Sequence, residues 1–338
     1  MRAQYLFPLL AGTLLACSKE DGVVPEVADE PFIMNMPIGA PSLPVPEANK
    51  LTKARVELGK ALFFDEGMSL GRGISCASCH FTDHAFSDTL ALSVGADGLT
   101  GLRNSPTLAN VAYHTAYFRD GGIPTLEQQV LAPIHDEAEM ASNILDAAEL
   151  FRGNDRYAEL SRLAYGRELD PFVITRAIAC YERTLVSGWS RYDRFHYEGD
   201  EGALTEQERR GYELFIGPST GCSGCHNGFD LSDHSFRNIG TSLDHAADPG
   251  RERITLDPAD RGKFKVPTLR NVAITGPYMH DGSLATLEEV MEHFATGGVS
   301  DPNKDALVHA LALTAQDKSD IVAFLHALTD DRSLDQVP

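Results

Sequence analysis

The chain has 338 residues, 43% of them hydrophobic, and its 49 acidic against 29 basic residues give a formal net charge of −20. This length and composition exclude a disordered chain and leave room for two domains with hydrophobic cores. The negative charge argues against nucleic acid as a partner and favours basic protein partners, although acidity also serves solubility.

The first residues have the pattern of an export signal. Arg2 precedes an apolar stretch that runs to Ala16, and Leu-Leu-Ala before Cys17 is similar to a bacterial lipobox. We expect a lipoprotein signal peptide over residues 1–16 and a lipid anchor on Cys17, with Ser18 favouring the outer membrane. An ordinary secretory signal is the alternative, and both place the chain in the bacterial periplasm. No other segment is long and apolar enough to span a membrane.

The rest of the chain shows helical patterns separated by loops. Residues 17–50 are rich in Pro, Glu and Ala without periodicity, which predicts a tether and then an extended arm over the surface. Thr205 with Glu208 has the pattern of a capping box, and Thr314 that of an N-cap. Strand signals are weak, so we expect an all-α fold with a long loop over residues 229–265. Helices are expected over residues 52–64, 124–131, 144–151, 155–165, 171–186, 205–215, 286–295 and 314–328.

Two short motifs share the pattern Cys-x-x-Cys-His. In this pattern two thiols bond to the vinyl groups of a haem, and the adjacent histidine is an axial ligand of the iron. Zinc sites also use Cys-x-x-Cys pairs, but they need four ligands brought together and no histidine directly after each pair. Cys180, in an apolar helical pattern, is expected to be a buried, inert thiol. We predict two covalently bound haem c groups, attached through Cys76, Cys79 and His80 and through Cys222, Cys225 and His226.

The segments after the two motifs repeat each other. Residues 106–127 (PTLANVAYHTAYFRDGGIPTLE) align without gaps on residues 267–288 (PTLRNVAITGPYMHDGSLATLE), at an offset of 161 residues. Two homologous halves are the economical explanation. We expect two cytochrome c-type domains with long loops, over residues 51–200 and 201–338.

From about residue 51 to 328 the chain resembles the bacterial di-haem cytochrome c peroxidase superfamily, including its MauG-like branch and methanobactin-associated subgroup. The resemblance rests on LGKALFFDE before CASCH, and on RNSPTL, FRDGG, LEQQVLAPI, YERTLVSG and KVPTLRNVAITGPYMHDGS. It implies that His80 holds a peroxidatic haem and His226 an electron-transfer haem. It also implies that Glu139 is the distal carboxylate that moves protons on peroxide, with Gln129 in the same distal pocket.

The resemblance further implies a calcium ion between the domains, held by Asn104 and the backbone carbonyls of Thr275 and Pro277. Oxygen atoms of this kind suit a hard cation. Classical relatives have a histidine sixteen residues beyond the first proximal histidine, which caps the resting iron. Ala96 stands there in this chain, so we expect an iron that is open without prior reduction.

Two further positions depart from the family pattern. Arg119 stands where relatives often have a tryptophan that conducts between the haems, so a tyrosine route through Tyr117 and Tyr278 or direct tunnelling would replace it. Phe294 stands where relatives have a Met or Tyr ligand of the C-terminal haem iron. Met291, one turn earlier, is our candidate for that ligand, with His293 as the alternative.

The leading functional hypothesis is a periplasmic peroxidase that reduces hydrogen peroxide with electrons from a c-type cytochrome or a cupredoxin. MauG-like oxidation of a residue in a partner protein is the alternative. A hypothesis of another class is a non-enzymatic electron-transfer cytochrome, which would have no need of Glu139 and Gln129. A homodimer is left open.

Overall fold

The computed structural model describes residues 30–337, so the predicted signal peptide and Cys17 lie outside the described residues. The fold is mainly helical, and no helix among the described residues is long and apolar enough to cross a membrane. Residues 31–46 contain no helix and run along the surface. The helices are α1 (Lys53–Phe63), α2 (Leu126–Gln129), α3 (Leu131–His135), α4 (Ile144–Arg152), α5 (Asp155–Tyr165), α6 (Pro171–Glu182), α7 (Arg191–Tyr197), α8 (Glu206–Ile216), α9 (Glu252–Thr255), α10 (Leu287–Thr296) and α11 (Ala315–His326).

One short sheet interrupts the predicted loop. Strand β1 (Phe236–Arg237) pairs antiparallel with β2 (Phe264–Lys265). Helix α9 and a 3-10 helix (Pro258–Asp260) lie between them in the sequence, so the segment over residues 229–265 is a loop with four short elements.

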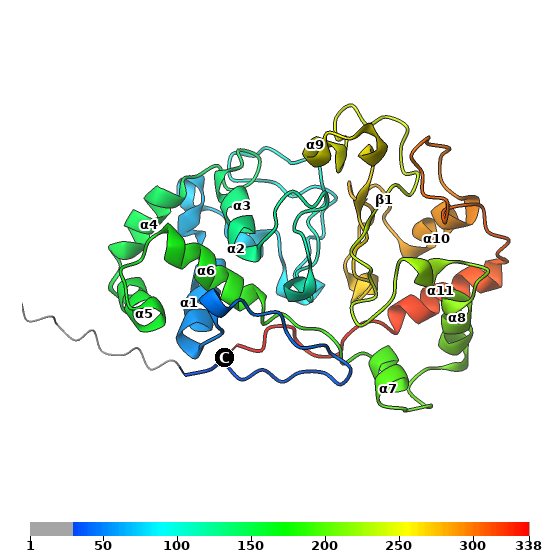
Figure 1. Cartoon of the computed structure of the whole chain (residues 1–338), viewed down its shortest axis with the longest axis horizontal. Coiled ribbons are helices and arrows are strands. Elements are labelled where there is room, and N and C mark those ends of the chain that lie inside the picture. The colour runs from blue at the N-terminus through cyan, green and yellow to red at the C-terminus, as the bar shows by residue number, and fades with distance from the viewer. Residues whose placement is uncertain (1–29, 338) are drawn as a thin grey trace, which may run out of the picture.

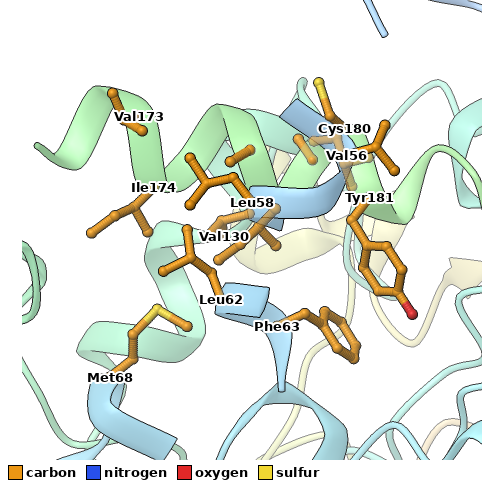
Figure 2. Close-up of a cluster of buried hydrophobic side chains, with 14 of the residues drawn as sticks. Val56, Leu58, Leu62, Phe63, Met68, Val130, Val173, Ile174, Cys180 and Tyr181 are labelled. Atoms are coloured by element: carbon orange, nitrogen blue, oxygen red, sulfur yellow. The ribbon is translucent and has the colours of Figure 1, made fainter. Parts of the chain in front are cut away.

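The helices form two lobes, and the long loops of both lobes face each other between them (Figure 1). In the first lobe α1 crosses α6 at Gly59, where an added Cβ would lie 1.9 Å from the carbonyl oxygen of Ala177. Only glycine allows this approach of two backbones. The crossing buries Leu58 and Leu62 completely, together with Tyr181 of α6 (Figure 2).

The second lobe repeats this crossing with α8 and α11. An added Cβ on Gly211 would lie 1.9 Å from the carbonyl oxygen of Asp320. The side chains around this crossing form a second hydrophobic cluster, whose buried members are Tyr192, Phe215, Leu231, Val272, Leu287, Met291, Ile321, Val322, Phe324, Leu325 and Leu328.

The predicted helix starts are confirmed where side-chain caps were expected. Thr205 Oγ1 accepts the Glu208 N–H at 3.3 Å, and Glu208 Oε2 accepts the Thr205 N–H at 2.8 Å, which completes the capping box of α8. Thr314 caps α11 by accepting the Asp317 N–H at 3.1 Å. The helix expected over residues 124–131 is instead split into α2 and α3, because Pro133 has no N–H to donate to the carbonyl of Gln129.

Packing divides the chain differently from the predicted boundary at residue 200. Tyr192 of α7 belongs to the second cluster, whereas Leu334 and Val337 belong to the first. The final segment crosses back to the first lobe (Figure 1), where Asp335 forms a 3.1 Å ion pair with Lys60 of α1.

Candidate active site

Both Cys-x-x-Cys-His motifs adopt the same tight turn. In the first, the N–H groups of Cys79 and His80 donate to the carbonyl of Cys76 at 3.2 and 3.1 Å. In the second, the equivalent bonds to the Cys222 carbonyl are 3.2 and 3.0 Å long. The turn brings the two thiols and the following imidazole of each motif close together, which the covalent attachment of a haem requires.

The two motif histidines are oriented by backbone carbonyls. Nδ1 of His80 lies 2.9 Å from the Phe86 oxygen, and Nδ1 of His226 lies 3.1 Å from the Leu231 oxygen. A proton on Nδ1 leaves Nε2 as the nitrogen that can bind iron. Burial lowers the pKa of both histidines, which favours the neutral form that a metal needs.

A cavity of about 800 Å³ lies beside the first motif. Its lining includes Cys76, Cys79 and His80, together with the predicted distal residues Gln129 and Glu139. The volume is within the range of cofactor sites in proteins. Two thiols and an imidazole in the wall of one cavity fit a covalently attached haem c.

Glu139 combines access to the cavity with a raised pKa. The open cavity leaves its side chain accessible to solvent, although protein atoms surround it on most sides. The surrounding protein atoms, with a smaller contribution from the negative charge of Asp136, raise the pKa of Glu139 to about 7. A carboxyl group with that pKa can both accept and return a proton near neutral pH.

The loop that contains Ala96 packs against the backbone of Glu139. The Ala96 N–H donates to the Glu139 carbonyl at 2.7 Å. An added Cβ on Gly95 would lie 2.3 Å from the Ala138 oxygen and 2.6 Å from the Glu139 oxygen. The loop that contains Ala96 is therefore a backbone support for Glu139.

We expect Gly95→Ala to lower the rate of the peroxide reaction, because the new methyl group must displace the backbone of Glu139. Both haems should stay attached, since Gly95 lies outside both motifs. Gly101→Ala is the control, because a Cβ at Gly101 meets no atom within 4 Å. Stopped-flow mixing with hydrogen peroxide measures the effect, and equal rates for the two variants would contradict it.

Glu182 is a cavity residue that the sequence analysis missed. It lies at the end of α6 and lines the cavity, and its Oε2 has no hydrogen-bond partner among the described residues. Burial raises the pKa of Glu182 to about 8, so the carboxyl group is mostly neutral at pH 7. In the sequence, only its position in the YERTLVSG motif, as a charged residue on an apolar helix, could have indicated a role in the site.

The three residues predicted to hold calcium, Asn104, Thr275 and Pro277, all line the cavity. However, the side-chain oxygen of Asn104 already accepts a 2.6 Å hydrogen bond from Arg119. A Ca²⁺ ion about 4 Å from that guanidinium would meet a repulsion of about 8 kcal/mol at an effective dielectric constant of 20. The predicted calcium site stays a prediction, and these contacts do not fit it.

The predicted ligands of the second haem lie on α10. Met291 is 5% exposed and packs in the second cluster with Leu287. His293 Nε2 lies 2.9 Å from the carbonyl oxygen of Ile239, so a backbone contact engages its ring. Phe294 is half-buried and offers no ligand atom. Ligation by Met291 stays a prediction.

A buried polar cluster connects the two halves. Asp230 Oδ2 lies 3.8 Å from His114 Nε2 and 3.4 Å from His234 Nε2, a spacing that could hold a metal ion. Lys265 Nζ, however, lies 3.1 Å from His114 Nδ1. A protonated lysine donates to Nδ1, which leaves the proton of a neutral imidazole on Nε2 and removes that atom as a ligand. We assign the cluster to the interface and not to a metal.

The fold and the two Cys-x-x-Cys-His turns define the class of c-type cytochromes with two haem sites, and the carboxyl group of Glu139 lines the cavity beside the first turn. A family model described as di-haem cytochrome c peroxidase matches residues 53–202. The methylamine utilization protein MauG of Methylorubrum extorquens is 37% identical over 289 residues, which cover 85% of this chain and 81% of that protein.

Two further relatives support the same family. The cytochrome c551 peroxidase of Nitrosomonas europaea is 36% identical over 88% of this chain and 86% of its own. The crystal structure of a MauG-like protein associated with microbial copper homeostasis superimposes with a TM-score of 0.85 and 32% identity, over 90% of this chain and 97% of that one. The chain belongs to the di-haem cytochrome c peroxidase family.

Proposed function

We propose that the chain is a periplasmic di-haem peroxidase, which reduces hydrogen peroxide at the N-terminal haem with electrons passed through the C-terminal haem. The observation that carries the proposal is that Glu139 lines the cavity of the first Cys-x-x-Cys-His motif and has a pKa of about 7. A pure electron carrier has no need of an acid–base group there. Relatives named as cytochrome c peroxidases support the same activity.

The haem supplies an iron that binds peroxide and accepts oxidising equivalents. The residues of the chain then have distinct tasks. His80 would hold the iron through Nε2, and its ring is oriented by the Phe86 carbonyl. The carboxylate of Glu139 would accept a proton from one oxygen of hydrogen peroxide and return it to the other, which would leave as water. Gln129 lines the same cavity and can hold peroxide by a hydrogen bond.

We further propose that the two halves are homologous cytochrome c domains in a fold that is all-α apart from the short sheet. Asn110 and Asn271, related by the repeat offset, both have left-handed backbones and equivalent bonds. The Asn110 side-chain oxygen accepts the Ser187 N–H at 2.9 Å, and that of Asn271 accepts the Asp330 N–H at 2.8 Å. Bonding of this kind at matched positions supports an internal repeat.

The location and partners are also part of the proposal. The export signal places the chain in the periplasm with a lipid anchor at Cys17 in the outer membrane, and its net charge of −20 suits a basic cytochrome or cupredoxin as donor. The proposed function includes no calcium ion, because the Arg119 guanidinium already donates a hydrogen bond to the side-chain oxygen of Asn104. A homodimer stays a prediction.

Absorption and EPR spectra of the purified ferric holoprotein, before and after one equivalent of hydrogen peroxide, test the function. We expect one high-spin haem, open without prior reduction, whose spectrum changes at once on mixing. Two low-spin haems that do not react with peroxide, even after partial reduction, would instead identify an electron-transfer cytochrome. Reaction only after partial reduction would keep the peroxidase function and contradict the inference from Ala96.

Oxidation of a residue in a partner protein is the second candidate function. It is favoured by Ala96, which leaves no histidine to cap the iron, and by the MauG relatives. Arg119 in place of a conducting tryptophan disfavours it, because a guanidinium is not readily oxidised. Tyr117 and Tyr278 line the cavity from both halves and offer an alternative route for electrons.

We expect Met291→Leu to change the low-spin EPR signal of one haem and to lower its reduction potential, because a thioether ligand raises the potential of haem iron. Met34→Leu is the matched control, since Met34 lies on the N-terminal arm, outside α10 and outside the lining of the cavity. Unchanged spectra and potentials in the Met291 variant would remove this residue from the ligand set.

A further inference from the structure

Arg119 is a cation in the interior of the molecule with no salt bridge to a carboxylate among the residues that the structure describes. It lines the cavity between the halves, and protein atoms surround its guanidinium. Burial, followed by the neighbouring charge of Arg103, lowers the pKa of Arg119 to about 10, which still leaves it charged at neutral pH. The hydrogen bonds of the guanidinium go to neutral oxygen atoms, and the negative charge of Asp281 favours its charged form from a greater distance.

Asn104 supplies those oxygen atoms. Nε of Arg119 donates to the backbone carbonyl of Asn104 at 2.9 Å, and Nη2 donates to its Oδ1 at 2.6 Å. The orientation of the amide follows from its other end, since Nδ2 donates to the Leu90 carbonyl at 3.1 Å. Both oxygens of Asn104 thus hold a cation that belongs to the chain itself.

This pair lies where the two halves of the molecule meet. The Asn104 N–H donates to the carbonyl of His280 at 2.8 Å, and the carbonyl of Arg119 accepts the N–H of Lys265 at 2.6 Å. His280 and Lys265 come from the second half of the sequence, whereas Arg119 and Asn104 come from the first. The Arg119–Asn104 pair therefore fixes two points of the interface.

The charges around the pair disfavour a further cation. Arg103 lines the same cavity, and it engages the nearby acids Asp120 and Asp248 through hydrogen bonds of 2.7 Å. The buried ammonium of Lys265 also lies in this cavity wall. The carboxylates of Asp120 and Asp248 are thus engaged by Arg103, an added divalent ion would meet the guanidinium of Arg119 itself, and its predicted side-chain ligand is already occupied.

We propose that the guanidinium of Arg119 takes the place of the calcium ion that the family resemblance predicts between the domains. The chain then holds its halves together with an internal cation and has no calcium requirement. This inference concerns the interface, so it stands or falls independently of the peroxidase function. Release of calcium cannot loosen this interface, and calcium-free conditions should leave the protein assembled.

The purified holoprotein tests the proposal directly. After dialysis against millimolar calcium and then against metal-free buffer, elemental analysis should find two iron atoms and far less than one calcium per chain. The thermal midpoint, followed by haem absorbance and circular dichroism, should be the same in EGTA and in calcium. One tightly held calcium per chain, together with a lower midpoint in EGTA, would overturn the proposal.

Two substitutions at the same position separate charge from packing. Arg119→Gln removes the cation and frees Asn104, so its midpoint should fall by a few degrees in EGTA and rise again with calcium but not with magnesium. Arg119→Lys keeps a positive charge and should stay insensitive to calcium. A glutamine variant as stable as the parent chain and without a calcium response would contradict the proposal. If that variant does not fold, the measurements on the parent chain still decide.

Discussion

Replacing Glu139 with glutamine should slow the reaction with hydrogen peroxide by at least about 100-fold, the usual contribution of a positioned acid–base group. Glutamine has nearly the same shape but cannot accept the peroxide proton. Both haems should stay attached and the ferric spectrum nearly unchanged, because Glu139 lies outside both motifs. Stopped-flow absorption in excess peroxide measures the rate.

The same residue predicts a pH dependence. Below its pKa of about 7 the Glu139 carboxyl group is protonated and cannot accept a proton, whereas above that pH it is an available base. The rate of the peroxide step should therefore rise with pH, with a midpoint near 7. In Glu139→Gln this rise should disappear.

Glu137→Gln is the matched control, since Glu137 is an exposed acid two residues away. Its rate and pH profile should equal those of the parent chain. An undiminished rate in the Glu139 variant would remove this residue from the mechanism, whatever the control shows. A reduced rate with an unchanged pH profile would instead assign the pH dependence to another group.

Replacing Gly59 with alanine should lower the stability of the protein strongly. The added methyl group would lie 1.9 Å from the Ala177 oxygen and 2.9 Å from Cβ of Tyr181, so α1 and α6 must separate. Overpacking of this kind costs about 3 kcal/mol or more. For a lobe of this size, that corresponds to a fall in Tm of about 10 °C.

Gly73→Ala provides the comparison for this prediction. Gly73 has φ of −118°, and a Cβ there meets no atom within 4 Å, so the substitution should leave Tm unchanged. Thermal unfolding followed by circular dichroism compares the two variants. Equal midpoints would show that the helices can relax apart at little cost.

Local chemistry explains which features could be predicted. A Cys-x-x-Cys-His turn closes within six residues, and the carbonyl that orients its histidine follows within six more, so the attachment residues are readable without the fold. Caps such as Thr205 also depend only on neighbouring residues, and the structure confirms them. Glu139 was identified by a motif resemblance, but its raised pKa depends on atoms from several elements.

Features that depend on distant contacts were partly missed. Glu182 looked like a residue of an apolar helix, yet the packing of α6 places it in the cavity wall. The final residues were expected in the second domain, but Leu334 and Val337 complete the first hydrophobic cluster. A segment after the last helix has no periodicity that would reveal which lobe it contacts.

The amino-acid sequence by itself determined the two Cys-x-x-Cys-His turns and the helical class, because these depend on short-range contacts along the chain. Only the tertiary structure decided what surrounds the sites. It joined Glu139 to the cavity of His80, and it brought Arg119 to the oxygens of Asn104, fifteen residues away in the chain. Burial and charge act through space, so the pKa of a carboxyl group and the identity of an interface cation depend on which loops meet between the lobes.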